Sequence, residues 1–201
     1  MIEKLRQVLF MRGYRLFMRP FELNIVGVRS NNQLPNGFDD HIYVFYMDAQ
    51  ANWRTLSFPA TTDPGTHWLQ NPMNVNGTAI LKPGQYIGAY QIGLHRGKYQ
   101  ALVQRKPVTV FRDFDRNGDF DFSGARQETG MFGINIHRAL PSGTTSNVDK
   151  HSAGCQVFAN ADDFATFMRL CKAHKERYGN SFTYTLLTDV FSQTHNAAMA
   201  A

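Results

Sequence analysis

At positions 41–47 the chain reads HIYVFYM, a run of aromatic and β-branched residues. Such side chains favour extended backbone, so the run predicts a β-strand. A second run of this kind, 53–58, follows a short polar stretch and can pair with the first. We expect the two segments to form part of a β-rich core.

Further strand candidates lie on both sides of this pair and are separated by turn-forming residues. They are residues 21–28, 78–81, 85–92, 99–104, 108–112, 133–137 and 182–187. Residues 60–77 are rich in Thr, Pro, Asn and Gly, and they predict a long loop. Many short strands with turns between them are typical of a sandwich or a barrel. We therefore expect a mainly β, α+β domain over residues 21–189.

Two segments have the residue spacing of helices. The first lies in the N-terminal arm, residues 1–20, and predicts a short amphipathic helix. Its apolar side chains are Ile2, Leu5, Val8 and Leu9. Such a helix packs on its own domain, docks a partner or anchors at a surface. The second, longer helix begins after Asn160, a candidate N-cap, and ends at Gly179, whereas residues 190–201 form a tail.

The composition fits one folded domain. The 201 residues are 43% hydrophobic and 13% aromatic, which is enough for a buried core. The formal charge is +5 and the basic residues are scattered, so an anionic partner and a plain solvated surface both fit. No nucleic-acid-binding motif is present, so we expect no nucleic-acid partner. No apolar run is long enough for a transmembrane segment, and Arg12, Arg15 and Arg19 argue against a secretory signal.

The two cysteines are too few for a disulfide framework. Cys171 lies on the apolar face of the longer predicted helix, where we expect it to be buried. Cys155 has small or polar neighbours instead, in the stretch SAGC at 152–155. It follows His137, at the end of a predicted strand, by eighteen positions. The chemistry therefore belongs to Cys155.

A cysteine in such a turn is a candidate nucleophile. The thiolate is the reactive form, so the site needs a base nearby, and His137 is the candidate. Gly154 allows a sharp turn, which aims the N–H groups of Ala153, Gly154 and Cys155 at a developing oxyanion. Ser152 opens this turn. The pattern predicts acyl transfer through a thioester.

Chain order separates this pattern from two known types of cysteine peptidase. Papain-like enzymes place Cys before His, and caspase-type enzymes place His about fifty residues upstream of Cys. Residues 136–137 and 152–155 resemble instead the L,D-transpeptidases of peptidoglycan metabolism, whose pattern runs from Ile-His-Gly at a strand end to Ser/Thr-His-Gly-Cys. Residues 78–86 are similar to the Thr-Pro-x-Gly-x-Tyr/Phe segment of that family, in altered form.

The resemblance implies an L,D-transpeptidase-like β-sandwich or barrel with an N-terminal helix and one long helix after the cysteine. It implies that Cys155 attacks a carbonyl of a peptidoglycan stem peptide and that His137 accepts the thiol proton. It further implies that the backbone carbonyl of Arg138 orients the imidazole. The chain departs from the family pattern at Arg138, Ala153 and Gln156, which leaves the acceptor open. The candidates for substrate binding are Arg138, His151 and Gln156.

Hydrolysis, as by a lysin-like L,D-carboxypeptidase or endopeptidase, is the interpretation we favour over cross-linking. The sequence has neither a secretory signal nor a wall-binding repeat. This suggests that a phage tail, an injection particle or lysis delivers the protein to the cell wall or periplasm. Cross-link formation is one alternative, and a structural or wall-binding tail component without turnover is another. The expected partners are stem peptides, and the N-terminal helix is a candidate surface for protein assembly.

Residues 113–121 read DFDRNGDFD and match part of the calcium-loop pattern. The candidate metal ligands are Asp113, Asp115, Asn117, Asp119 and Asp121. Gly124 stands where the pattern has its bidentate Glu, and Asn117-Gly118 is also a hairpin-turn signal between 108–113 and 120–122. A structural calcium ion and a metal-free acidic turn both remain open. The expected chemistry itself requires no cofactor.

Three aromatic side chains outside these motifs are further candidates for the site. His95 follows Gly93-Leu94 and is expected on a surface hairpin rather than in a cleft. Trp53 and Trp68 are expected to pack in the core or to anchor a loop, with stacking on sugars as the alternative.

Overall fold

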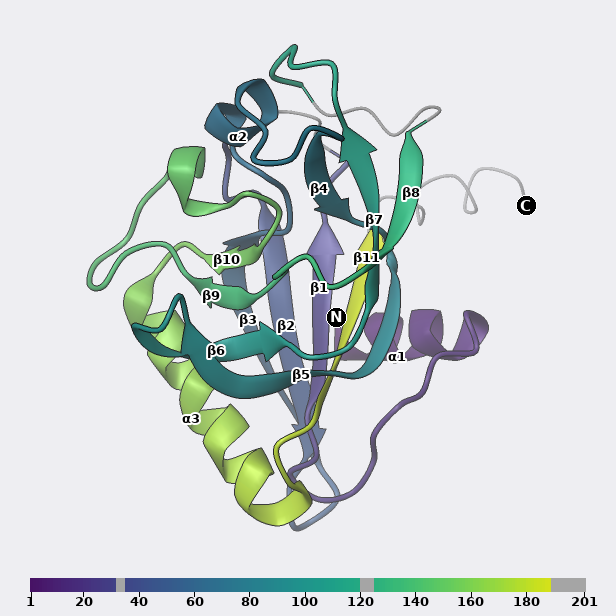
Figure 1. Ribbon diagram of the computed structural model, residues 1–201. Coiled ribbons are helices and arrows are strands. Elements are labelled where there is room, and N and C mark those ends of the chain that lie inside the picture. Colours follow the sequence, from purple (N-terminus) through teal and green to yellow (C-terminus); the bar gives the residue numbers. More distant parts are fainter. Residues whose placement is uncertain (32–34, 120–124, 189–201) are drawn as a thin grey trace, which may run out of the picture.

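The computed structural model describes residues 1–31, 35–119 and 125–188, and eight of its strands close into a barrel (Figure 1). In their order around the barrel the strands are β1 (Asn24–Arg29), β11 (Phe182–Thr188), β5 (Gly84–His95), β6 (Tyr99–Gln104), β9 (Ile136–Arg138), β10 (Gln156–Phe158), β3 (Trp53–Thr61) and β2 (Asp40–Met47). The pairs β1–β11 and β9–β10 are parallel, and the other pairs are antiparallel. The predicted mainly β core is confirmed, and it takes the form of a barrel.

The predicted hairpin is formed by β2 and β3. The β2 strand is apolar on both faces because each face meets another apolar layer. Ile42 and Val44 belong to the core of the barrel, whereas Tyr43 and Phe45 lie in a second apolar cluster beneath α1 (Ile2–Met11). A strand covered on both sides carries a continuous apolar run rather than an alternating one. This explains the sequence HIYVFYM.

The N-terminal helix α1 packs on the outer face of the barrel. Leu5 and Leu9 are fully buried against apolar side chains of β1, β2 and β11. Trp53 packs beside this cluster, with the Arg6 guanidinium 4.9 Å from the centre of its ring. The apolar face of α1 therefore packs on its own domain. Phe10, on the other side of the helix, is exposed.

The long helix after the cysteine is α3 (Ala161–Tyr178). It begins as predicted, because the Asn160 side chain accepts hydrogen bonds from the N–H groups of Asp162 and Asp163 at 2.7 and 3.0 Å. Its buried face joins the core of the barrel through Phe164, Phe167, Met168 and Cys171. The predicted burial of Cys171 is confirmed, since the side chain is fully buried.

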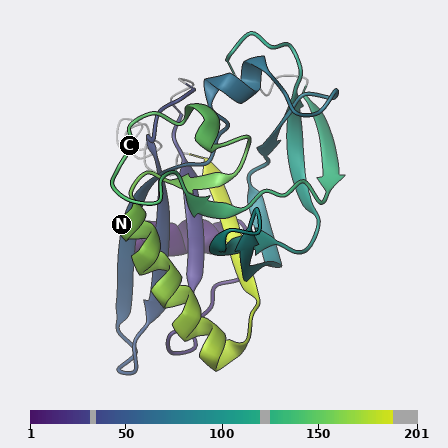
Figure 2. The same ribbon diagram turned by 60° about the vertical axis from the view of Figure 1, so that its left-hand side comes forward.

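A separate three-stranded sheet consists of β4 (Thr78–Leu81), β7 (Val108–Asp113) and β8 (Arg126–Gly130). Figure 2 shows it beside the barrel, on the side away from α3. The predicted strand over 120–122 lies outside the described residues, and β7 pairs with β8 instead. Within the described part of the chain, no helix has both the length and the apolar character needed to cross a membrane.

The expectation of a long loop over residues 60–77 is wrong in part. The segment contains a short helix, α2 (Thr66–Gln70), whose Leu69 is fully buried against Ile80 of β4. One buried side chain in a polar segment leaves no helical periodicity to detect, so tertiary packing specifies this helix. A 3₁₀ turn, η1 (Asp149–His151), lies against α2, and the indole of Trp68 donates to the Lys150 carbonyl at 3.1 Å.

Candidate active site

The barrel brings the predicted cysteine and histidine to neighbouring strands. β9 and β10 are parallel, with Ile136 opposite Gln156 and His137 opposite Val157. Cys155 directly precedes β10. Because side chains alternate along a strand, the positions of Cys155 and His137 share one side of this strand pair. Two residues that are eighteen positions apart in the sequence thus lie on adjacent strands.

Ser152 organises the cysteine turn. Its hydroxyl donates to the Cys155 carbonyl at 2.8 Å and accepts from the Gly154 N–H at 3.2 Å. Its own carbonyl accepts from the Gly65 N–H at 2.9 Å, which links the turn to the start of α2. Ser152 is fully buried, so these hydrogen bonds are shielded from water. The side chain therefore has a structural role in the turn.

Gly154 is required by two independent features. Its φ of 110° lies in the left-handed region that side chains with a Cβ avoid. A Cβ at this position would also clash with the carbonyl oxygen of Ala79 in β4. The cysteine turn is thus pressed directly against the three-stranded sheet.

The expected set of three oxyanion donors needs a correction. The Gly154 N–H is already bonded to the Ser152 hydroxyl, so it is not available to a substrate. The N–H groups of Ala153 and Cys155 have no hydrogen-bond partner among the residues that the structure describes. Two donors on the turn, rather than three, remain for a developing oxyanion.

The Cys155 thiol is partly exposed and held in its neutral form. It donates to the Gly133 carbonyl at 3.5 Å and accepts from the Asn135 N–H at 3.4 Å. Burial of the sulfur raises the pKa of Cys155, while the Asn135 N–H and the positive charge of Arg96 oppose this effect. The raised pKa favours the neutral thiol of the candidate nucleophile.

The His137 imidazole is buried and oriented by the backbone. Its Nδ1 lies 2.8 Å from the Arg138 carbonyl, so Nδ1 carries the proton and donates it there. The lone pair is then on Nε2, the nitrogen that can accept a proton. Burial, with a smaller contribution from the His95 charge, lowers the pKa of His137 to about 3. The ring is neutral at physiological pH.

The thiol and the imidazole each have other hydrogen-bond partners in the site. Among the described residues, no hydrogen bond joins Cys155 Sγ to His137. The thiol must release the Gly133 carbonyl before its proton can pass to Nε2. Catalytic hydrogen bonds are often loose without substrate and tighten in the complex. The absence of this hydrogen bond is therefore compatible with a catalytic pair as well as with a site that does not turn over.

His95 belongs to the site, which corrects its expected place on a surface hairpin. Its ring is buried and stacks on His137, with the centroids 4.1 Å apart. Asn135 connects it to the cysteine, since the Asn135 amide lies 3.1 Å from His95 Nδ1 while its N–H contacts Sγ. Tyr99 was also missed, and its hydroxyl lies 3.4 Å from His137 Nδ1. His95 and Tyr99 face each other at the end of the β5–β6 hairpin. The sequence signal for their burial was the alternation of side chains along β5, had the predicted strand been extended from residue 92 to residue 95.

The three substrate-binding candidates lie in different surroundings. The Arg138 guanidinium lies over the Tyr99 ring at 4.6 Å and donates to the Pro141 carbonyl at 3.0 Å. His151 is partly exposed, and its charge contributes to the low pKa of His137. Gln156 is fully buried and accepts from the Tyr184 hydroxyl at 2.7 Å, a position that suits a structural role inside the barrel.

The acidic segment forms a tight polar turn over its described part. The Asp115 carboxylate accepts from the N–H and side-chain amide of Asn117 at 3.1 and 3.0 Å, and Asn117 Oδ1 accepts from the Asp119 N–H at 2.7 Å. Asp113 ends β7 and is buried, whereas Asp121 lies outside the described residues. In residues 1–31, 35–119 and 125–188, no three His, Cys, Asp or Glu side chains converge as metal ligands.

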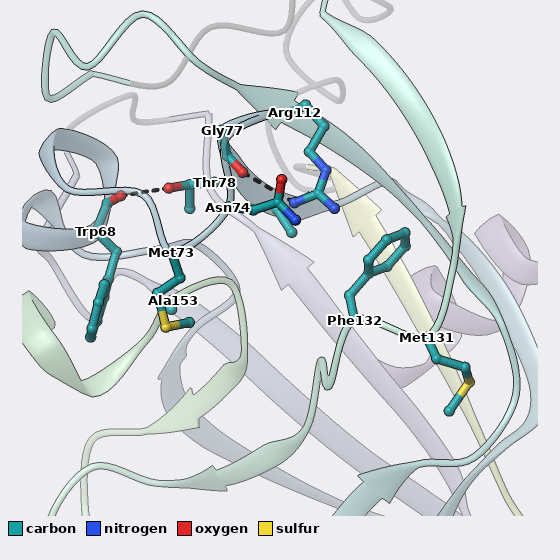
Figure 3. A pocket seen from close by; sticks show the side chains of 10 residues that line it. Trp68, Met73, Asn74, Gly77, Thr78, Arg112, Met131, Phe132 and Ala153 are labelled. Carbon is teal, nitrogen blue, oxygen red and sulfur yellow. Dashed lines mark hydrogen bonds between the residues drawn. The ribbon is translucent and has the colours of Figure 1, made fainter.

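A groove of about 270 Å³ opens beside the cysteine turn (Figure 3). It is lined by Trp68, Met73, Asn74, Gly77, Thr78, Ala79, Arg112, Met131, Phe132 and Ala153. Ala153 directly precedes the glycine of the turn and is two residues from Cys155. Of the two tryptophans, Trp68 lines this groove, whereas Trp53 packs against the apolar cluster beneath α1.

Comparisons with models of protein families, with curated proteins and with solved structures find no match for this chain. The features that bear on its chemistry are therefore the geometry of the site and the motif at 136–137 and 152–155.

Proposed function

We propose that this protein is a cysteine enzyme that transfers acyl groups of peptidoglycan stem peptides through a thioester on Cys155. The observation that carries the proposal is the orientation of His137 beside the cysteine turn. Its Nδ1–H is held by the Arg138 carbonyl at 2.8 Å, which leaves the Nε2 lone pair for the thiol proton. The choice of stem peptides rests on the L,D-transpeptidase motif.

Acylation starts from a neutral pair. The pKa of the Cys155 thiol is raised and that of His137 is lowered, so a resting thiolate–imidazolium pair is disfavoured. The proton must move to Nε2 as the S–C bond forms, which is general-base catalysis. The Arg138 carbonyl then stabilises the imidazolium, and the N–H groups of Ala153 and Cys155 bind the oxyanion. Each such donor is typically worth about 3 kcal/mol.

Breakdown of the tetrahedral intermediate returns the proton. The imidazolium of His137 protonates the leaving amine as the C–N bond breaks, and the acyl group remains on Cys155 as a thioester. In the second half, water or an amine attacks the thioester, His137 takes the proton of the acceptor and Cys155 leaves as a thiol. Water gives hydrolysis and an amine gives a cross-link. We favour hydrolysis.

Incubation with defined muropeptides, followed by mass spectrometry, tests the proposal. We expect the wild type to release a terminal D-Ala or to open a cross-link, and Cys155→Ala to do neither. The matched control is Cys171→Ala, which removes the buried thiol and should retain activity if it folds. A new cross-linked product would indicate transpeptidation. Equal product formation by wild type and Cys155→Ala would refute a cysteine enzyme.

A second candidate function is wall binding without turnover. It is favoured by the absence of a hydrogen bond between Cys155 Sγ and His137 in the described structure. This candidate predicts that sedimentation with purified peptidoglycan is equal for wild type and Cys155→Ala, and that neither produces soluble muropeptides. Turnover by the wild type alone would exclude it.

A further inference from the structure

The groove beside the cysteine turn has two chemically different ends. Figure 3 shows Trp68, Met73 and Ala153 toward one end and Arg112 with Phe132 toward the other. The Met73 and Met131 side chains are 70% and 55% exposed. Apolar side chains exposed around a concave site are typical of ligand grooves. The end at Ala153 adjoins the nucleophile.

The cation at the other end is fixed in place. Arg112 is buried on β7, with Nε donating to Glu128 at 2.9 Å and Nη1 donating to the Gly77 carbonyl at 3.1 Å. The Phe132 ring lies 4.9 Å from its Cζ. These contacts hold the guanidinium without using all of its five N–H donors. Nη2 has no hydrogen-bond partner in the part of the chain that the structure describes.

The charged side chains around Arg112 have a net positive charge, which favours the binding of an anion. Glu128 is shared, because it also lies 3.5 Å from Arg126, so the three side chains sum to one positive charge. The Asn74 amide lines the same groove, and its Oδ1 accepts from the Asn76 N–H, whereas its Nδ2 donor has no hydrogen-bond partner among the described residues. A buried cation with spare donors is stabilised by an anionic partner.

We propose that this end of the groove binds a carboxylate of the acyl donor, through Arg112 Nη2 and Asn74 Nδ2. The apolar walls hold the aliphatic part of the same molecule, and Ala153 marks the end where the scissile carbonyl meets Cys155. The preferred ligand class is a peptide with a free carboxylate next to an aliphatic chain. The link to catalysis rests on the proposed function, whereas carboxylate binding does not.

Calorimetry on the Cys155→Ala protein tests the site without turnover. The probes are a stem tetrapeptide with free carboxylates and the same peptide with its carboxylates amidated. We expect the free-carboxylate peptide to bind about tenfold more tightly or better, since a hydrogen bond to a charged group supplies that much. Equal binding of the two peptides would overturn the proposal.

Charge-balanced variants assign the effect to Arg112. Arg112→Gln with Glu128→Gln removes the cation without leaving a buried carboxylate unpaired, and should abolish the preference for the free peptide. Glu128→Gln alone should strengthen that preference, because it removes a competing anion. Arg169→Gln is the matched control, because Arg169 is exposed on α3 and does not line the groove, and it should retain the preference.

Loss of folding and loss of catalysis can each be told apart from loss of carboxylate binding. If the double variant does not fold by circular dichroism, Arg112→Lys, which retains the charge and lacks Nη2, should still reduce the preference. A preference that survives every change at Arg112 would overturn the proposal. Carboxylate-dependent binding without turnover by the wild type supports the groove and refutes only the proposed enzyme. Turnover by the wild type without a preference for the free carboxylate supports the proposed enzyme and refutes the carboxylate site in the groove.

Discussion

The imidazole rings of His95 and His137 stack with their centroids 4.1 Å apart and their planes inclined by 24°. Both rings are buried, and burial lowers the pKa of each. A positive charge on one ring would lie against the other, so protonation of either disfavours protonation of its neighbour. The stack therefore keeps the proposed base neutral and shields one face of it from water.

Removing the stacked ring should raise the pKa of His137. In His95→Ala, water reaches the exposed face and the neighbouring charge is gone, so we expect the pKa to rise from about 3 toward its ordinary value near 6.5. NMR titration of the His137 ring measures this directly. We expect kcat to fall about tenfold with little change in KM, because the ring loses its fixed orientation.

His95→Phe is the matched control for this prediction. It restores a stacked ring without a charge, and should recover most of the kcat that His95→Ala loses. His95 is therefore assigned as a positioning residue. An unchanged pKa of His137 in His95→Ala would contradict the assignment.

Acid should destabilise the protein through His137. Its pKa is about 3 when folded and about 6.5 when unfolded, so the unfolded chain binds more protons between these values. The stabilising contribution is complete above pH 6.5 and is lost as the pH falls toward 3. Urea unfolding at pH 7 and pH 5 should show that the change in the free energy of unfolding on going to pH 5 is less favourable in the wild type than in His137→Gln, by about 1–2 kcal/mol.

The variant His137→Gln isolates that contribution. Asp63, whose pKa is raised to about 7 mainly by burial, titrates over part of the same range, but it is present in both proteins. The difference between wild type and His137→Gln therefore reports the histidine. An identical pH dependence in the two proteins would argue against a buried neutral His137.

Gly154 and Gly143 provide a matched pair of glycine-to-alanine changes. Both have positive φ, at 110° and 73°, but only Gly154 has a neighbour in the way, the carbonyl of Ala79. We expect Gly143→Ala to lower the free energy of unfolding by about 1–2 kcal/mol, the cost of the left-handed conformation. Gly154→Ala should cost more than twice as much, or prevent folding, because backbone atoms must move. Similar values in denaturant unfolding would be inconsistent with the tight contact between the turn and β4.

Alkylation of Cys155 should be slow at neutral pH. Its pKa is raised by burial, so little of the reactive thiolate is present at neutral pH. The rate with iodoacetamide, followed by intact mass, should rise steeply with pH and show no plateau between pH 6 and 8. Arg96→Gln should shift the profile further upward, because this cation opposes the rise in pKa.

Cys155→Ala measures the background from the buried Cys171 in the same assay. A fast, pH-independent reaction near pH 6 would instead indicate a thiolate–imidazolium pair. The mechanism would then begin from an ion pair rather than from neutral groups.

Much of the site could be predicted from local sequence, although its arrangement could not. The SAGC turn and His137 stand out because small residues and a strand end have local signatures. The place of His95 in the site was not predicted, because its burial depends on a stack with His137, which is 42 positions away in the sequence. The Gly154 N–H was misassigned as an oxyanion donor because its bond to Ser152 depends on the conformation of the turn.

By itself the sequence determined the β-rich core, the capped helix after the cysteine and the identity of the candidate nucleophile and base. These follow from side-chain periodicity, capping and turn chemistry, which act over a few residues. Only the tertiary structure decided that eight strands close into a barrel, that β4 pairs with β7 rather than with its neighbour β5, and that Arg112 faces the cysteine turn across one groove. Such pairings depend on contacts between residues far apart in the chain, and no local pattern specifies which strand edges meet.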